Sequence, residues 1–130
     1  MPTTSSSNEP RGGRRVLVVD DNEDAAESLA ALLCLFGHDA AVAYDGEQSL
    51  ALAAEFRPEV VLLDLGMPHM DGHEVARRMR RAPWGASVKI VALSGFGSAA
   101  DVARSRAAGC DSHLVKPVSP NDLEGALADL

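Results

Sequence analysis

The chain contains four short apolar runs, and each is followed by side chains that can take part in chemistry. The runs and the residues that follow them are 16–19 with Asp20 and Asp21, 60–63 with Asp64, 90–93 with Ser94, and 114–115 with Lys116. Short runs rich in Val, Ile and Leu are typical of strands buried on both faces, which occur in parallel sheets covered by helices. In open sheets of that kind, functional groups collect beyond the carboxyl ends of the strands. We therefore expect these polar side chains to meet at one edge of a sheet.

Helical patterns separate the apolar runs along the chain. Asn22 is a suitable N-cap for the first helix, Gly37 ends it, and Arg57-Pro58 ends the second. The expected strands are 16–19, 40–43, 60–63, 88–93 and 113–115, and the expected helices are 23–36, 47–56, 73–81, 99–108 and 120–130. Five strands alternating with five helices, joined by right-handed crossovers, predict an α/β three-layer sandwich with a parallel five-stranded sheet.

Length and composition predict one globular domain with a short tail. The chain has 130 residues, and its first 13 are rich in Ser, Thr, Pro and Gly with almost nothing apolar to bury. Such a segment cannot offset its ordering entropy by burial, so we expect residues 1–13 to be a disordered tail or linker. Residues 14–130 are then the folded domain. The chain is either a single-domain protein or a domain of a longer one.

Charge and hydropathy argue against two classes of partner. The net charge is −7, whereas a nucleic-acid surface needs clustered Lys and Arg. The densest basic group is Arg77, Arg78, Arg80 and Arg81, which we interpret as a solvated helix face. No apolar stretch approaches the roughly 20 residues of a membrane span, and the N-terminus lacks the apolar core of a secretory signal. We expect a cytoplasmic protein that binds neither nucleic acid nor membrane.

The acidic residues at the expected sheet edge require a cation. Three carboxylates about 4 Å apart repel one another by several kcal/mol at an effective dielectric near 20. Mg²⁺ fits, with Mn²⁺ as an alternative ion, because it takes one or two carboxylates together with water and phosphate oxygens. Asp64 stands alone on its strand and is the expected nucleophile, with Asp20 and Asp21 holding the metal. Lys116 would neutralise a transferring phosphoryl group, and Ser94 would donate a hydrogen bond to it.

Four sequence blocks together closely resemble the response regulator receiver domain of two-component signalling. The blocks are Val18-Val19-Asp20-Asp21-Asn22, Leu63-Asp64-Leu65-Gly66-Met67-Pro68 with Met70-Asp71-Gly72, Ala92-Leu93-Ser94-Gly95, and Val115-Lys116-Pro117. The resemblance covers about residues 14 to 130 in the right order. It implies a flavodoxin-like (βα)5 sheet of strand order 2-1-3-4-5. It also suggests a receiver of the kind found in hybrid sensor histidine kinases.

The resemblance also implies a role for each site residue. Asp64 would be phosphorylated by a histidine kinase or a histidine phosphotransfer domain. Mg²⁺ would be held by Asp20 or Asp21, by Asp64, and by the backbone carbonyl of Gly66. Ser94 and Lys116 would bind the phosphoryl oxygens, and the peptide bond before Pro117 would be cis. Such a domain promotes only its own phosphorylation and dephosphorylation, so we do not expect an enzyme.

One position departs from the family pattern. His113 stands three residues before Lys116, where many receivers carry a Tyr or Phe switch residue. An imidazole forms hydrogen bonds and titrates near neutrality, so this site could respond to pH. The other interpretation is that His113 is simply a partly exposed strand residue. Phosphorylation would pull Ser94 inward and reshape the face made by the helix 99–108, the strand 113–115 and the last helix, where a downstream protein would bind.

Other functions stay open from the residues alone. A Mg²⁺-dependent phosphatase of the haloacid-dehalogenase type also has an aspartyl nucleophile at a strand end, but it needs a second acid two residues later, where this chain has Gly66. A flavin carrier would need a phosphate loop where Asp20 and Asp21 stand. A module that binds partners without phosphorylation is the third alternative.

Overall fold

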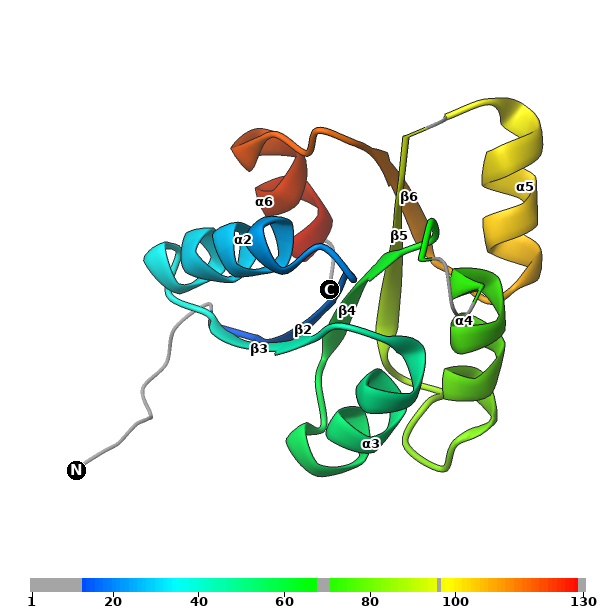
Figure 1. Cartoon of the computed structure of the whole chain (residues 1–130), viewed down its shortest axis with the longest axis horizontal. Coiled ribbons are helices and arrows are strands. Elements are labelled where there is room, and N and C mark those ends of the chain that lie inside the picture. Colours follow the sequence, from blue (N-terminus) through cyan, green and yellow to red (C-terminus); the bar gives the residue numbers. More distant parts are fainter. Residues whose placement is uncertain (1–12, 68–70, 96, 129–130) are drawn as a thin grey trace.

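The computed structural model of the chain describes residues 13–67, 71–95 and 97–128, and within them it forms a five-stranded parallel sheet of order β3-β2-β4-β5-β6 (Figure 1). The strands are β2 (Arg15–Val19), β3 (Asp39–Ala43), β4 (Val60–Asp64), β5 (Lys89–Ser94) and β6 (Ser112–Val115). The helices are α2 (Glu23–Leu35), α3 (Gly46–Phe56), α4 (Gly72–Arg81), α5 (Ala99–Ala107) and α6 (Pro120–Ala128). The expected fold and strand order 2-1-3-4-5 are confirmed.

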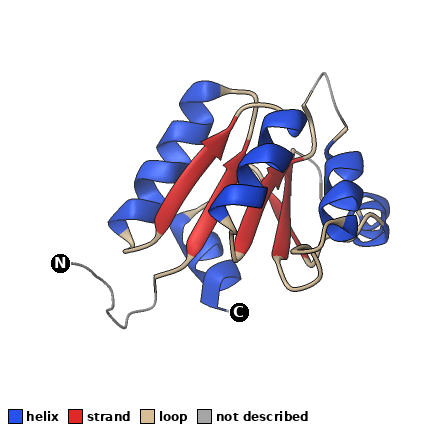
Figure 2. Cartoon of the chain, turned by 90° about the horizontal axis from the view of Figure 1, so that it is seen from below, coloured by secondary structure: helices blue, strands red, loops and turns tan. Residues whose placement is uncertain are grey.

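Helices cover both faces of the sheet (Figure 2), and β4 is its central strand. On one face α2 and α6 pack through Leu33, Leu123 and Leu127. On the other face α3 and α4 pack through Ala53 and Met79, among others. All five residues of β4 are buried, as the continuous apolar run predicts for a central strand. The core therefore fixes β4, and with it Asp64, from both sides.

Polar side chains cap the starts of four helices at the functional edge. The side chains of Asn22, Asp45, Asp71 and Ser98 each accept a hydrogen bond from a backbone N–H in the first turn of the helix that follows. Such caps satisfy N–H groups that a helix start leaves unpaired. Because the helices begin a few residues after the strands end, the polar residues between them stay at the sheet edge.

The structure corrects one interpretation and shifts some boundaries. Arg80 is not part of a solvated face: its guanidinium donates to the carbonyls of Gly85, Val88 and Gly109 and pairs with Asp111. The fourth strand is 89–94 instead of 88–93, and the other four strands and the first four helices each differ from the expected ranges by one residue at one end. The tail lies outside the described residues apart from Gly13, so its disorder stays a prediction. Among the described helices, none is both long and apolar enough to cross a membrane.

Gly72 provides a test of how tightly the loop after Asp64 is packed. A Cβ atom at this position would lie 2.7 Å from Cα of Leu65 and 2.8 Å from the carbonyl oxygen of Asp64. Both are backbone atoms that cannot move aside, so we expect Gly72→Ala to lower the free energy of unfolding by about 1–3 kcal/mol in urea titrations. Gly125→Ala is the matched control, since nothing lies within 4 Å of its Cβ and helical Ala is favoured over Gly by roughly 0.5–1 kcal/mol. Equal effects of the two substitutions would contradict the prediction.

Candidate functional site

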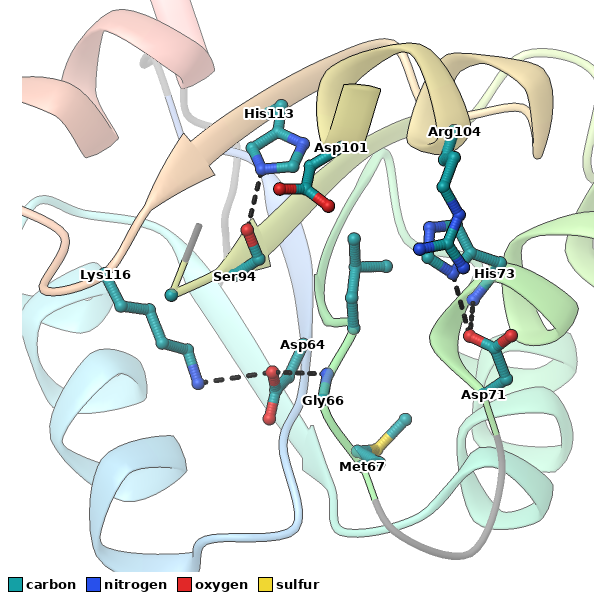
Figure 3. A pocket seen from close by; sticks show the side chains of 12 residues that line it. Asp64, Gly66, Met67, Asp71, His73, Ser94, Asp101, Arg104, His113 and Lys116 are labelled. Atoms are coloured by element: carbon teal, nitrogen blue, oxygen red, sulfur yellow. Dashed lines mark hydrogen bonds and ion pairs between the residues drawn. The ribbon is translucent and has the colours of Figure 1, made fainter. Parts of the chain in front are cut away.

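The strand register brings the expected site residues to one edge of the sheet. Val19 pairs with Leu63, so Asp20 and Asp64 leave their strands at the same level. Leu93 pairs with Asp64, which puts Ser94 one residue further along β5. Ser94 in turn pairs with Val115, directly before Lys116. Figure 3 shows the Lys116 side chain directed at Asp64, while the Ser94 hydroxyl points toward His113.

Three carboxylates form a cluster at this edge. Asp20, Asp21 and Asp64 each offer an oxygen, and these oxygens all lie within 4.8 Å of one another. Asp20 and Asp64 are only 4% and 6% exposed, whereas Asp21 is open to solvent. The two buried acids are each fixed by a backbone N–H two residues later, from Asn22 to Asp20 and from Gly66 to Asp64, both at 3.0 Å. The carboxylates are therefore held in place by their own turns.

Lys116 lies between the two buried carboxylates. Its Nζ is 3.2 Å from Oδ2 of Asp20 and 3.3 Å from Oδ1 of Asp64. Burial alone would lower the pKa of the Lys116 ammonium, but the charges of Asp64 and Asp20 outweigh it and raise the pKa. The peptide bond from Lys116 to Pro117 is cis, the geometry that the family resemblance implies. The ammonium group thus stays charged inside the acidic cluster.

One ammonium does not neutralise the cluster. Burial raises the pKa of the Asp64 carboxyl, and the nearby charge of Asp20 adds to this, although the Gly66 N–H and the Lys116 charge act in the opposite direction. Three carboxylates and one ammonium leave a formal charge of −3 + 1 = −2. A divalent cation would balance that charge, and an all-oxygen donor set is the one that Mg²⁺ and Mn²⁺ prefer. The residues present therefore fit such an ion.

Ser94 and His113 line a cleft of about 700 Å³ that starts at Asp64 and Lys116 and runs between α4 and α5. The Ser94 hydroxyl lies 2.7 Å from Nε2 of His113, so the two candidate switch residues are in direct contact. On the other side of its ring, His113 Nδ1 lies 3.1 Å from the hydroxyl of Ser105. The imidazole therefore connects the end of β5 to α5.

Sequence reasoning missed several residues of this cleft. Asp71 caps α4 and also binds the imidazole of His73 at 2.8 Å, while Asp101 and Arg104 enter from α5 (Figure 3). Burial of Asp71 acts against its ionisation, but the His73 N–H and imidazole outweigh it and lower the Asp71 pKa. An Asp two residues before a His at a helix start is a signal that could have found the first pair. Nothing in the sequence marks Arg104.

A second groove of about 480 Å³ lies on the other face of the sheet. Its lining is mostly apolar and comes from α2 and from the segment after β6, including Leu29, Leu32, Pro117 and Val118. Asp20 and Lys116 also line it. Among the described residues, Lys116 alone lines both this groove and the cleft at Asp64.

Comparisons with known proteins all point to the same family. A sequence model of the response regulator receiver domain matches residues 16–128. The DNA-binding response regulator MtrA of Mycobacterium tuberculosis is 40% identical over 110 residues, which are 85% of this chain and 47% of MtrA. The probable transcriptional regulator ycf27 of Guillardia theta is 35% identical over 113 residues, 87% of this chain and 43% of the relative. The chain thus spans about half the length of these relatives.

Solved structures of similar shape include a chemotaxis protein and the receiver domain of a histidine kinase. The chemotaxis protein CheY4 of Vibrio cholerae superposes with a TM-score of 0.86 at 29% identity, covering 90% of this chain and 98% of CheY4. The receiver domain of a signal transduction histidine kinase from Syntrophus aciditrophicus has a TM-score of 0.80 at 25% identity, covering 90% and 89%. The same architecture therefore occurs alone and within larger signalling proteins.

The raised pKa of Asp64 predicts that its charge destabilises the metal-free fold. An acid whose pKa is higher in the folded state than in the unfolded state favours folding at low pH, and this contribution is lost as the pH rises through the folded pKa. We therefore expect Asp64→Asn to have a higher free energy of unfolding than the parent at pH 7 in chelator-treated buffer, with the difference shrinking toward pH 4. Asp39→Asn, at an exposed position at the start of β3, is the control. A variant less stable than the parent at pH 7 would contradict this.

Proposed function

This chain belongs to the family of response regulator receiver domains, and from that premise we propose that Asp64 accepts a phosphoryl group in a Mg²⁺-dependent reaction. The donor is a phosphohistidine of a histidine kinase or of a histidine phosphotransfer domain. The observation that carries the proposal is the buried Asp64 carboxylate, held 3.3 Å from a lysine ammonium and beside two further acids. A nucleophile, a cation and a metal-binding acid pair are the parts that phosphoryl transfer needs.

Contacts and exposure favour Asp64 over Asp20 as the acceptor. The backbone N–H of Gly66 and the Lys116 ammonium both bind Oδ1 of Asp64, so Oδ2 takes neither contact. Asp20 uses Oδ1 for the Asn22 N–H and Oδ2 for Lys116. Asp64 also lines the 700 Å³ cleft, which Asp20 does not. Asp20 and Asp21, with the carbonyl of Gly66, are then the metal ligands beside the acceptor.

The transfer follows from these positions. A carboxylate oxygen of Asp64 attacks phosphorus, the bond from phosphorus to the donor nitrogen breaks, and the imidazole of the donor leaves with the electron pair. The product is an acyl phosphate on Asp64. A bound Mg²⁺ would supply positive charge to the phosphoryl oxygens. Lys116 supplies a second positive charge, and its raised pKa keeps it protonated throughout.

The apolar groove beside the site suggests how a protein donor docks. Leu29 and Leu32 of α2 line it together with Pro117 and Val118, and Asp20 and Lys116 of the acidic edge line it as well. An apolar helix face of the donor would bury this surface and bring its phosphohistidine to the acidic edge. We infer that this groove binds the helix of the donor, while the phosphohistidine reaches Asp64 at the acidic edge, where the groove meets the cleft at Lys116.

The signal would leave at the β6 edge of the sheet. Ser94 is the hydroxyl nearest the end of β5, and moving it toward Asp64 changes its contact with His113 and hence with α5. The output surface in our proposal is the face of α5, β6 and α6, where a downstream protein binds. The DNA binding named for MtrA is a property of that longer protein, and our expectation of no nucleic-acid contact stays a prediction.

Labelling with a small phosphodonor tests the acceptor. Incubation with Mg²⁺ and acetyl phosphate or phosphoramidate is expected to give an acid-stable, base-labile adduct on Asp64, located by mass spectrometry of peptides. Asp64→Asn should abolish the adduct, Lys116→Gln should slow its formation roughly 100-fold through loss of a preorganised charge, and Asp39→Asn should not change it. An adduct that survives in Asp64→Asn would overturn the assignment. Sustained turnover of phosphate esters would favour the phosphatase alternative instead.

Metal binding can be measured without any phosphodonor. Mg²⁺ at about 100 times its dissociation constant should stabilise the fold by roughly 2.7 kcal/mol, seen as a higher melting temperature. Asp21→Asn should remove most of this shift, because Asp21 belongs to the cluster but is exposed and carries no packing role. Asp39→Asn should keep it. A shift of equal size in both variants would show that the ion binds elsewhere.

A further inference from the structure

His113 lies between two hydroxyl groups that belong to different elements. Ser94 ends β5 and contacts Nε2 at 2.7 Å, and Ser105 on α5 contacts Nδ1 at 3.1 Å. Ser105 is 1% exposed, so its hydroxyl needs partners inside the protein. Figure 3 shows the imidazole directed at the Ser94 side chain. Both ring nitrogens of His113 are thus engaged at once.

The number of protons on these groups fixes the direction of each bond. Ser105 has one hydroxyl proton, which it donates to the carbonyl oxygen of Val102 at 2.9 Å. Its oxygen must then accept from Nδ1 of His113, so Nδ1 carries the ring proton. A neutral imidazole has only one N–H, which leaves a lone pair on Nε2. This assignment from the network makes Ser94 the donor to His113.

The direction of that bond matters for phosphoryl binding. Phosphoryl oxygens on Asp64 only accept, and Ser94 has a single hydroxyl proton to give. While His113 is neutral, the proton of Ser94 is directed at Nε2, and donation to a phosphoryl group requires breaking that bond. When a proton from water binds Nε2, the imidazolium donates from both nitrogens. The Ser94 oxygen then accepts from His113, and its own proton becomes available to the phosphoryl group.

We propose that His113 is a proton-controlled positioning residue, which holds the Ser94 hydroxyl away from Asp64 when neutral and directs it toward a phosphoryl group when protonated. Acidification toward pH 6 would therefore favour the phosphorylated state of this chain. The inference rests on the proposed function, because it assumes a phosphoryl group on Asp64. It gives the chain a second input besides its phosphodonor.

The charged groups around His113 are consistent with this control. Those that share its cleft are Asp101 and Arg104 of α5, Asp71 and His73 at the start of α4, Asp64 of β4, and Lys116 beyond β6. Three acids thus face two permanent cations and a second imidazole. A phosphoryl group adds roughly 1.5 to 2 negative charges to this cleft. That added charge attracts a proton to His113, and by linkage a proton on His113 strengthens phosphoryl binding.

The test measures binding of a stable phosphoryl mimic at different pH values. Beryllium trifluoride with Mg²⁺ is titrated into the whole chain by calorimetry between pH 8 and pH 6. We expect the affinity of the parent to rise roughly tenfold as the pH falls, equivalent to about 1.4 kcal/mol. His113→Phe removes the proton acceptor and should show no such rise, while Ser105 keeps its bond to Val102. His73→Gln, which removes the other imidazole of the cleft, should behave like the parent.

The outcomes separate the inference from the proposed function. Titration of Asp64 itself acts in the opposite direction and is common to all three proteins, so the comparison between variants isolates His113. No binding of the mimic to the parent at any pH would refute the phosphoacceptor role. Binding with the same pH dependence in the parent and in His113→Phe would refute the inference alone. Nitrogen NMR of the parent at pH 8 should find the ring proton on Nδ1, and a proton on Nε2 would also overturn it.

Discussion

The ion pair of Lys116 with two buried carboxylates is the interaction on which the functional edge depends. Asp20 and Asp64 are nearly inaccessible to water, and charges in such places are tolerated only with a partner. Lys116 directly follows a third strand, so the ion pairs connect the ends of β2, β4 and β6. Removing the ammonium would leave two close carboxylates facing each other inside the protein. The fold and the site are therefore stabilised by the same contacts.

The incomplete neutralisation of the cluster is what makes it a site. A structural ion pair would match charges, whereas here the pKa of Asp64 stays raised despite Lys116. The remaining negative charge favours a divalent cation, and the cation in turn would admit an anionic phosphoryl group. We therefore expect the metal-free state to lose stability in return for this affinity, a compromise often found at functional sites.

The sequence was sufficient to predict the strands, the sheet order and the acidic edge, because each depends on a local pattern that ends at a defined residue. Asp64 follows an unbroken apolar run. Once that run pairs as a parallel strand, Asp64 must lie at the carboxyl edge of the sheet. Arg80 and Ser105 could not be predicted in the same way. Arg80 binds carbonyls from loops up to 29 residues away, and Ser105 meets His113 only through the packing of α5 on β6. Such contacts depend on side-chain reach across the fold, which local periodicity does not encode.

In our proposal, the position of Lys116 between two cavities links donor entry to signal output. The apolar groove and the large cleft lie on opposite faces of the sheet, and Lys116 lines both. A donor in the groove acts from the side of Asp20, while Ser94 and His113 respond from the side of Asp64. Phosphorylation by a donor in the groove would thus be read in the cleft, where Ser94 and His113 contact α5. In this chain the reading side contains an imidazole between two hydroxyls, so the response to phosphate and the response to protons converge on the single hydroxyl proton of Ser94.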